Sequence, residues 1–350
     1  MSSAKKKFDS LQVFRGLAAL GVVIRHTAIS TDSHIASIPA WLDGIFKNGF
    51  LGVDFFFVLS GFIIMSSHFN DEKSVAAWKT YGFKRFVRIF PPYWPIAIAL
   101  MLSYIFLPSL GQETRHYSVL SSLLLLPDYQ PPALIVAWTL IHEVLFYLIF
   151  CLFFISNRVF LIFLACWVFA IGVTASHFKA VAYSPFFTVL LHPINLEFVF
   201  GMCTAYLATK TSKHLGIPLI FLGFSTFALL LLWPFAYECR FLFGLSFSAL
   251  VLGSVLLEHG KALPIPRWMV LIGDASYSIY LIHNPLNSVT GRLIGRFQGF
   301  ATWGVGMLVG VISSIIAGVI YHFIIEKPLI RLFRRGKEAL LKRPVKADLI

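Results

Sequence analysis

The sequence predicts an all-α integral membrane protein, a bundle of about ten transmembrane helices with both termini in the cytoplasm. Hydrophobic residues make up 58% of the 350 residues and charged residues only 13%, which is far more apolar than a soluble domain of this length. The apolar residues also form stretches too long and continuous for the alternating short strands of an outer-membrane barrel. These two observations lead to a helical bundle.

Ten apolar stretches are long enough to cross a bilayer as helices. They lie near residues 11–30, 50–68, 90–108, 137–156, 159–176, 190–208, 215–234, 241–258, 269–288 and 301–325. We expect the first to be retained as a helix and not cleaved as a signal, because it contains ionisable residues and no small-residue cleavage site follows it. We expect one membrane domain over residues 1–330 and a basic cytoplasmic tail over 331–350.

The formal net charge of +13 is distributed over alternate loops. The basic residues concerned are Lys5 to Lys7, then Lys73, Lys79, Lys84, Arg85 and Arg88, then Arg158, Lys210, Lys213, Lys261 and Arg267, and the tail from Lys327 to Lys346. Placing these loops in the cytoplasm satisfies the positive-inside rule and puts both termini there. Nucleic acid is therefore not needed to explain the charge, and the tail is expected to lie on the anionic inner lipid surface.

The first apolar stretch, FRGLAALGVVIRHT, contains Arg15 and His26. They would lie roughly 16 Å apart along a helix. An ionisable side chain inside a bilayer costs several kcal/mol, so such residues usually face a polar cavity and mark chemistry or transport. Further ionisable residues occur in later apolar stretches, namely Asp54, Glu143, Glu197, Asp274 and His283. The pattern predicts a polar site inside the bundle.

In the second stretch, Asp54 needs a cationic partner. We expect Arg15, Arg25 or His26 to supply it. The carboxylate would then either orient a reactive base or act as a polar lock between two helices.

The segment FKRFVRIFPPYW precedes the third stretch and carries Arg85 and Arg88. A spacing of three places both guanidinium groups on one helical face at the membrane surface, where they can hold phosphate groups. The alternative is that they are ordinary anchors of the positive-inside kind.

The fourth stretch carries Glu143 and Tyr147, which share one helical face because they are four residues apart. In the ninth, Tyr277, Tyr280 and His283 form a polar stripe. His283 would either support the site or cap the end of its helix.

Two further acidic residues are Glu197 and Glu326. Glu197 lies deep within its apolar stretch. Glu326 lies near the end of the chain, and we expect it to form a structural ion pair with Lys327. The four cysteines have no spacing typical of a metal site, so no metal is expected.

Five motifs occur in a fixed order along the chain. They are Arg15 with His26, GVDFFFVLSGF (52–62), RFVRIFPPYW (85–94), WTLIHEVLFY (138–147) and SYSIYLIH (276–283). Together they resemble the acyltransferase 3 family of membrane-bound O-acyltransferases, from about residue 8 to residue 330. The segment LHPINLEFVFGM resembles the exopolysaccharide O-acetyltransferase branch of that family.

The resemblance implies a multi-pass protein of the bacterial inner membrane. Such a protein moves an acyl group, usually acetyl, from cytoplasmic acyl-CoA to a hydroxyl of an extracytoplasmic or lipid-linked polysaccharide. Acetyl-CoA would be a co-substrate, and no metal is implied. The expected site has His26, Arg15 and Glu143 as catalytic residues, Arg85 and Arg88 as acyl-CoA ligands, and Asp54, Tyr147, Glu197 and His283 in support.

Two other classes of function fit the same helices. A transporter or flippase for a glycan or small anionic solute also needs buried carboxylates and cavity-facing arginines. A scaffold subunit of a polysaccharide assembly complex would use the polar residues as locks between helices. The sequence leaves open whether the chain forms a homo-oligomer or joins such a complex.

Overall fold

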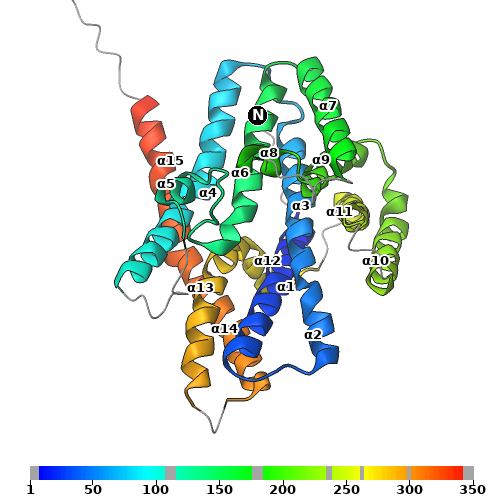
Figure 1. Ribbon diagram of the computed structural model, residues 1–350. Helices are drawn as coiled ribbons and strands as arrows, with labels where there is room; N and C mark the ends of the chain where they lie inside the picture. The colour runs from blue at the N-terminus through cyan, green and yellow to red at the C-terminus, as the bar shows by residue number, and fades with distance from the viewer. Residues whose placement is uncertain are drawn as a thin grey trace, which may run out of the picture.

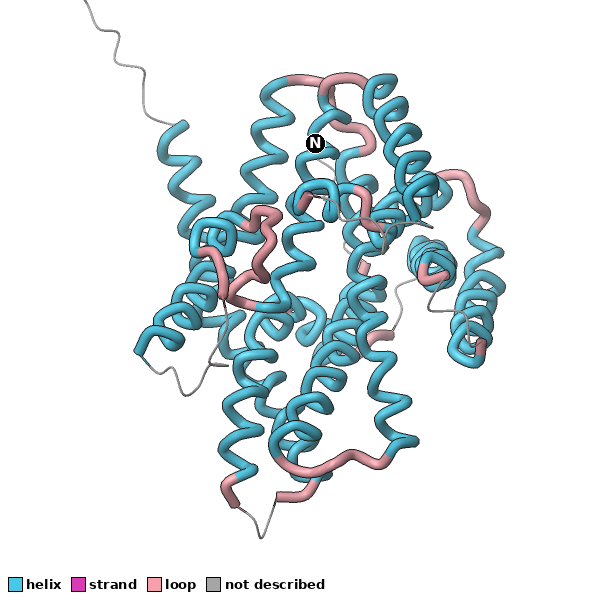
Figure 2. The backbone as a smooth tube through the Cα atoms, in the orientation of Figure 1, coloured by secondary structure: helices cyan, strands magenta, loops and turns pink. Residues whose placement is uncertain are grey.

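The computed structural model describes residues 8–106, 116–175, 184–233, 239–260, 264–297 and 301–341. Every regular element in these ranges is helical, which confirms the predicted all-α class (Figure 2). The α-helices are α1 (Asp9–His34), α2 (Ala40–Lys47), α3 (Leu51–His68), α4 (Val75–Phe106), α5 (Val119–Leu124), α6 (Trp138–Phe150), α7 (Asn157–Ala175), α8 (Pro185–Leu190), α9 (Leu196–Ala208), α10 (Gly216–Leu232), α11 (Phe241–Gly260), α12 (Arg267–Asp274), α13 (Ser276–Gly295), α14 (Trp303–Tyr321) and α15 (Lys327–Leu341).

Within the described ranges, eight helical stretches are long and apolar enough to cross a membrane. They are Asp9–His34, Ala40–His68, Val75–Phe106, Ile135–Phe154, Asn157–Ala175, Lys213–Leu232, Phe241–His259 and Trp303–Lys337. The remaining two predicted stretches are helical too, but they differ in form. The stretch at 190–208 contains the short helix α9, and the stretch at 269–288 is divided between α12 and α13.

Helix α4 begins earlier than the sequence suggested. We expected the third stretch to begin near residue 90, but α4 starts at Val75 and runs through Pro91, Pro92 and Pro95. Each proline removes one backbone hydrogen bond from the helix. Arg85 and Arg88 therefore lie inside a continuous helix, one turn apart, as their spacing required.

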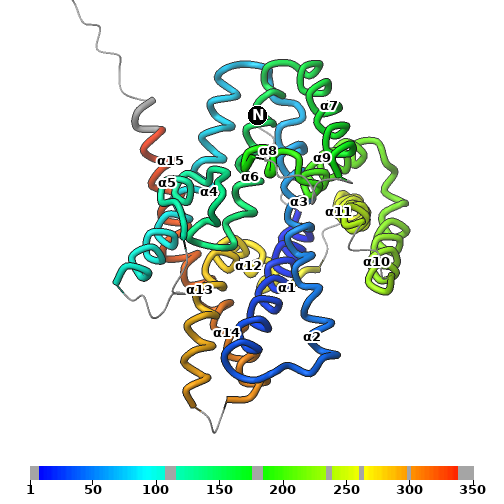
Figure 3. The backbone as a smooth tube through the Cα atoms, in the orientation of Figure 1, coloured from blue at the N-terminus to red at the C-terminus, as the bar shows by residue number. Residues whose placement is uncertain are grey.

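Helix α1 is central to the packing. It contacts α3, α11, α12, α13 and α14, so the amino-terminal helix lies beside helices from the last third of the chain (Figures 1 and 3). Gly16 of α1 lies against the backbone of Gly273 at the end of α12. The close approach of two backbones is typical of helices packed through small residues in membranes.

Helices α3 and α9 form another close pair. Gly61 of α3 lies against the carbonyl of Phe198, and Gly201 of α9 lies against the carbonyl of Val58. No larger side chain fits at either position without moving a backbone. Residue 60 of α3 directly precedes Gly61. The packing of α3 on α9 therefore directs residue 60 toward the interior of the bundle, beside α6.

The predicted tail begins as a helix. Helix α15 starts at Lys327 and continues across residue 331, where we expected the tail to begin, to Leu341. The rest of the tail and Lys5 to Lys7 lie outside the described residues.

Candidate functional site

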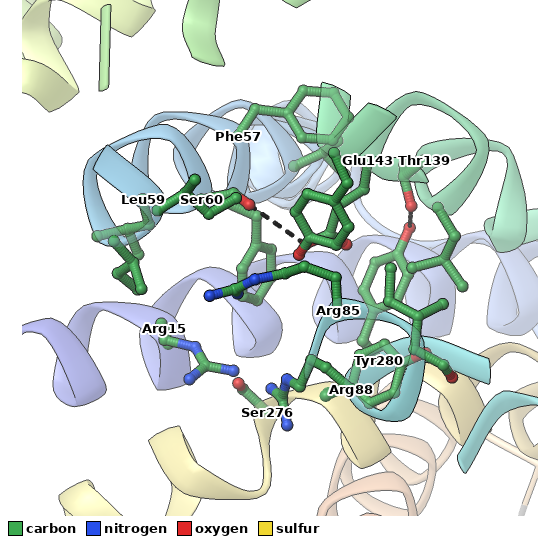
Figure 4. A pocket seen from close by; sticks show the side chains of 18 residues that line it. Arg15, Phe57, Leu59, Ser60, Arg85, Arg88, Thr139, Glu143, Ser276 and Tyr280 are labelled. Carbon is green, nitrogen blue, oxygen red and sulfur yellow. Dashed lines mark hydrogen bonds between the residues drawn. The ribbon is translucent and has the colours of Figure 1, made fainter. Parts of the chain in front are cut away.

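A buried cavity of about 140 Å³ lies between α1, α3, α4, α6 and α13 (Figure 4). A volume of this size holds several water molecules or a small polar group. Its polar lining residues are Arg15, Ser60, Arg85, Arg88, Thr139, Glu143, Tyr147, Ser276, Tyr277 and Tyr280. We call it the arginine cavity. Three residues that the sequence placed in separate motifs, Arg15, Arg85 and Glu143, therefore share one site.

The three arginines differ in how their charge is compensated. Arg88 donates from Nη1 to Oε1 of Glu326 at 2.6 Å. Arg15 donates to the neutral side chain of Gln12 at 3.3 Å, and the buried Nε of Arg85 has no hydrogen-bond partner. Over the described ranges, no carboxylate lies within ion-pair distance of Arg15 or Arg85. Because buried charge is costly unless it is paired, the arginine cavity is suited to an anionic ligand.

Glu326 holds Arg88 in place, and our expectation that it pairs with Lys327 was wrong. It is 1% exposed and also accepts a hydrogen bond from Ser278 Oγ at 2.6 Å, while His322 Nδ1 lies 2.7 Å from its Oε2. His322 and Glu326 are four residues apart and lie on one side of the chain, which forms a π-helical turn over His322–Glu326. Arg88 belongs to a distant helix, so no local spacing in the sequence could show its contact with Glu326.

Glu143 and Tyr147 lie side by side on α6, as their spacing predicted. The Tyr147 hydroxyl donates to Glu143 Oε1, and Ser60 Oγ donates to the same oxygen at 3.3 Å. Arg85 lies 5.5 Å above the ring of Tyr147, a cation–π arrangement. Glu143 is therefore an oriented carboxylate that faces the two uncompensated arginines.

His26 lies outside the arginine cavity and contacts His283 instead. Nδ1 of His26 is 3.3 Å from Nε2 of His283, and the two rings meet edge to face at 5.0 Å. His283 is completely buried. Tyr280 links the two places, because it lines the arginine cavity and its ring lies 5.6 Å from that of His283. The expected pair of Arg15 and His26 thus occupies two connected regions along α1, about 16 Å apart.

Asp54 pairs with Arg240, which corrects our expectation of Arg15, Arg25 or His26. Arg240 donates from Nε and Nη2 to the two carboxylate oxygens, with the second bond at 2.6 Å, and Asp54 is completely buried. Arg25 instead lies 3.7 Å from Asp43. A bidentate pair of this kind fixes two chain segments in one orientation.

Glu197 is fully buried on α9, and Gly244 of α11 packs against its side chain. Neither Glu197 nor Asp54 lines the arginine cavity. Of the two roles considered for Asp54, its position favours a polar lock that joins α3 to the start of α11. We did not single out Arg240 from the sequence. The available signal was a lone arginine just before an apolar stretch.

A second cavity of about 640 Å³ adjoins the arginine cavity, because Arg15 and Ile63 line both. It is formed by the first turns of α1 and the last turns of α3 and α9, and its polar lining includes Gln12, Asn70 and Thr209. Among the described residues, no group of three or more histidine, cysteine or acidic side chains is arranged to hold a metal ion.

Residues 8–322 match a family model described as an acyltransferase domain. The chain is 32% identical to the exopolysaccharide production protein ExoZ of Rhizobium meliloti (strain 1021) over 311 residues, which cover 82% of this chain and 91% of that protein. It is 25% identical to the acyltransferase MdmB of Streptomyces mycarofaciens over an alignment that covers 95% of this chain and 94% of that protein. No solved structure matches the chain.

The Asp54–Arg240 pair can be tested by a double-mutant cycle on thermal stability in lipid nanodiscs. Asp54→Asn and Arg240→Gln should each destabilise the protein, because Arg240→Gln leaves the fully buried carboxylate of Asp54 without its partner and Asp54→Asn leaves the half-buried guanidinium of Arg240 without its partner. The double variant should lose less stability than the sum of the two single losses, with a coupling free energy of about 0.5–3 kcal/mol.

Asp54→Asn combined with Arg15→Gln is the matched control, and its effects should add within about 0.5 kcal/mol. Additive behaviour of the Asp54 and Arg240 changes, or coupling between Asp54 and Arg15, would contradict the assignment.

Proposed function

This chain belongs to the acyltransferase 3 family of membrane proteins, and from that premise we propose that it is an O-acyltransferase that uses acetyl-CoA. The proposed reaction moves the acetyl group from the cytoplasmic side of the bacterial inner membrane to a hydroxyl of an extracytoplasmic or lipid-linked polysaccharide. The observation that carries the proposal is the arrangement along α1, where Arg15 shares the arginine cavity with Arg85 of α4 and His26 meets His283 further along the helix.

The arginine cavity is proposed as the place where the donor's phosphates bind. Arg15 and Arg85 present guanidinium groups that have no carboxylate in ion-pair distance among the described residues, and guanidinium forks match phosphate oxygens in geometry and charge. Glu143 offsets part of this charge, so that the empty cavity is not left with the full repulsion of its arginines. The adjoining second cavity offers more space for the nucleotide, toward the amino-terminal end of α1.

The spacing along α1 fits the length of the donor. About twelve bonds separate the diphosphate from the thioester sulfur of acyl-CoA, as many as in four extended residues, or roughly 14 Å. Arg15 and His26 are about 16 Å apart along the helix. A donor whose diphosphate lies at Arg15 can therefore bring its thioester near His26. The same separation supports a phosphate-binding role for Arg15 over direct contact with the reacting carbonyl.

His26 is proposed as the general base. Its neutral imidazole takes the proton of the acceptor hydroxyl while that oxygen attacks the thioester carbonyl. The new ester bond forms, the carbon–sulfur bond breaks, and the proton held by His26 passes to the departing thiolate. A covalent acyl-histidine intermediate would use the same residue. The similarity to ExoZ, a protein of exopolysaccharide production, supports a surface polysaccharide as the acceptor.

The transfer itself is tested with the purified chain in lipid vesicles, radiolabelled acetyl-CoA and the polysaccharide of the source cells. His26→Ala should lower the rate at least 100-fold, because a general base contributes about 10²–10⁴-fold. His34→Ala is the matched control. His34 is an exposed histidine on the same helix, and its loss should leave the rate within about twofold.

Full transfer by a well-folded His26→Ala variant would contradict the proposed base. Movement of the glycan across the vesicle membrane without acetyl-CoA, and without labelling, would favour a flippase instead.

Donor binding separates the roles of the arginines. Arg85→Gln and Arg15→Gln should each weaken the binding of CoA by about tenfold or more, because each removes a charge-assisted bond of about 1.5–3 kcal/mol. Arg88→Gln should chiefly lower thermal stability, because it leaves the carboxylate of Glu326 buried without its cation. Titration calorimetry and thermal melts in nanodiscs measure the two effects.

Arg158→Gln, at an exposed position at the start of α7, controls for the general loss of positive charge. If Arg85→Gln folds normally and binds CoA with unchanged affinity, then Arg85 is a topological anchor and not a ligand.

A further inference from the structure

We propose that His283 is a positioning residue for His26: it accepts the Nδ1–H of His26 and so leaves Nε2 of His26 bare as the base. This inference rests on the proposed function, but its geometric content can be measured without any turnover. It assigns a role to the polar stripe of α13, whose tyrosines line the arginine cavity while its histidine does not.

The protonation of His283 follows from its neighbour in the chain. Its Nδ1 lies 2.7 Å from the backbone carbonyl of Tyr280. A carbonyl oxygen can only accept a hydrogen bond, so Nδ1 of His283 must carry the hydrogen. In a neutral imidazole the other nitrogen then has a lone pair and no hydrogen. The Nε2 of His283 that faces His26 is therefore an acceptor.

The protonation of His26 follows in the same way. Its Nδ1 lies 3.0 Å from the carbonyl of Val22 and 3.3 Å from Nε2 of His283. Both neighbours are acceptors, so Nδ1 of His26 carries the hydrogen and shares it between them. The Nε2 of His26 makes no hydrogen bond with any residue in the described ranges. One arrangement of two neutral rings satisfies all three contacts and leaves a single free lone pair, at the nitrogen proposed as the base.

The position of His283 matters because the contact of His26 with the carbonyl of Val22, which lies in the same helix, does not by itself fix the orientation of the His26 ring. Val22 is four residues before His26 on the same helix, whereas His283 belongs to α13 and is completely buried. Tyr280 holds His283 through its carbonyl, and its own hydroxyl donates to the carbonyl of Val136 at 3.0 Å. The orientation of the His26 ring is thereby tied to three helical segments.

In this arrangement a neutral histidine orients the proposed base, where a carboxylate could have done so. Asp54, the acid expected to orient the base, is engaged by Arg240. The charged residue next to His26 in the chain is Arg25, which lies near Asp43. When His26 takes the proton of the acceptor, a neutral imidazole accepts the strengthened Nδ1–H bond. The imidazolium is supported less strongly than by an anion, which favours prompt return of the proton to the departing thiolate.

The first test is the tautomer of His26 in the full chain, labelled with ¹⁵N-histidine in nanodiscs. The signals of His26 are those absent from the spectrum of His26→Gln. At a pH where the ring is neutral, Nδ1 should show the shift of a protonated nitrogen and Nε2 that of a bare one. In His283→Phe a second tautomer should become populated. A wild-type spectrum with Nε2 protonated and Nδ1 bare would overturn the proposal.

The second test separates positioning from packing by kinetics. His283→Phe should lower kcat by about 10- to 100-fold, the usual effect of losing a residue that orients a functional histidine, with KM for acetyl-CoA unchanged. His283→Gln, which keeps an acceptor oxygen, should recover most of the loss. His142→Phe is the control for the packing effect of replacing a buried histidine by phenylalanine, because His142 is buried and contacts Asn195.

Equal losses in His283→Phe and His283→Gln, or full kcat in His283→Phe, would overturn the positioning role. If the wild-type chain transfers no acyl group at all, the proposed function fails, while the ¹⁵N spectrum still decides whether the two rings have the assigned tautomers.

Discussion

The structure depends on one constraint, the cost of placing ionisable side chains inside an apolar bundle. Each such residue must be paired, kept neutral or supplied with a ligand. All three solutions occur. Asp54 with Arg240, and Arg88 with Glu326, are paired, while His26 lies against His283 in a contact that we propose joins two neutral rings. Arg15 and Arg85 line the arginine cavity and, among the described residues, have no carboxylate within ion-pair distance.

This division explains how one set of motifs serves both stability and chemistry. The paired charges join segments far apart in sequence, since Asp54 meets Arg240 across 186 positions and Arg88 meets Glu326 across 238. They join α3 to the start of α11, and α4 to the π-helical turn between α14 and α15. In the function we propose, Arg15, Arg85 and the histidine pair are the residues that contact the substrates. In the proposed reaction, the first group attracts the donor's phosphates and the second receives the acceptor's proton.

Much of the fold could be predicted from the sequence, because hydrophobic length and local spacing act within one helix. The helical class, the shared face of Glu143 and Tyr147 and the turn from Arg85 to Arg88 are features of this kind. Partners across helices could not be predicted. The spacing of Asp54 gives its helical face but not the helix opposite, so Arg240 was missed. Glu326 was assigned to its neighbour Lys327 because its partner Arg88 lies 238 positions earlier in the chain, where no local spacing points to it.

In the proposed function, α1 connects a donor site on one side of the membrane with an acceptor site on the other. Sealed vesicles that hold the chain in one orientation, as judged by protease access to an amino-terminal tag, test it most directly. Radiolabelled acetyl-CoA is placed on the side of the tag and an impermeant polysaccharide acceptor on the opposite side. If acetyl transfer occurs across the membrane, label will reach the acceptor while the membrane stays intact. Labelling only when donor and acceptor share one side would contradict it.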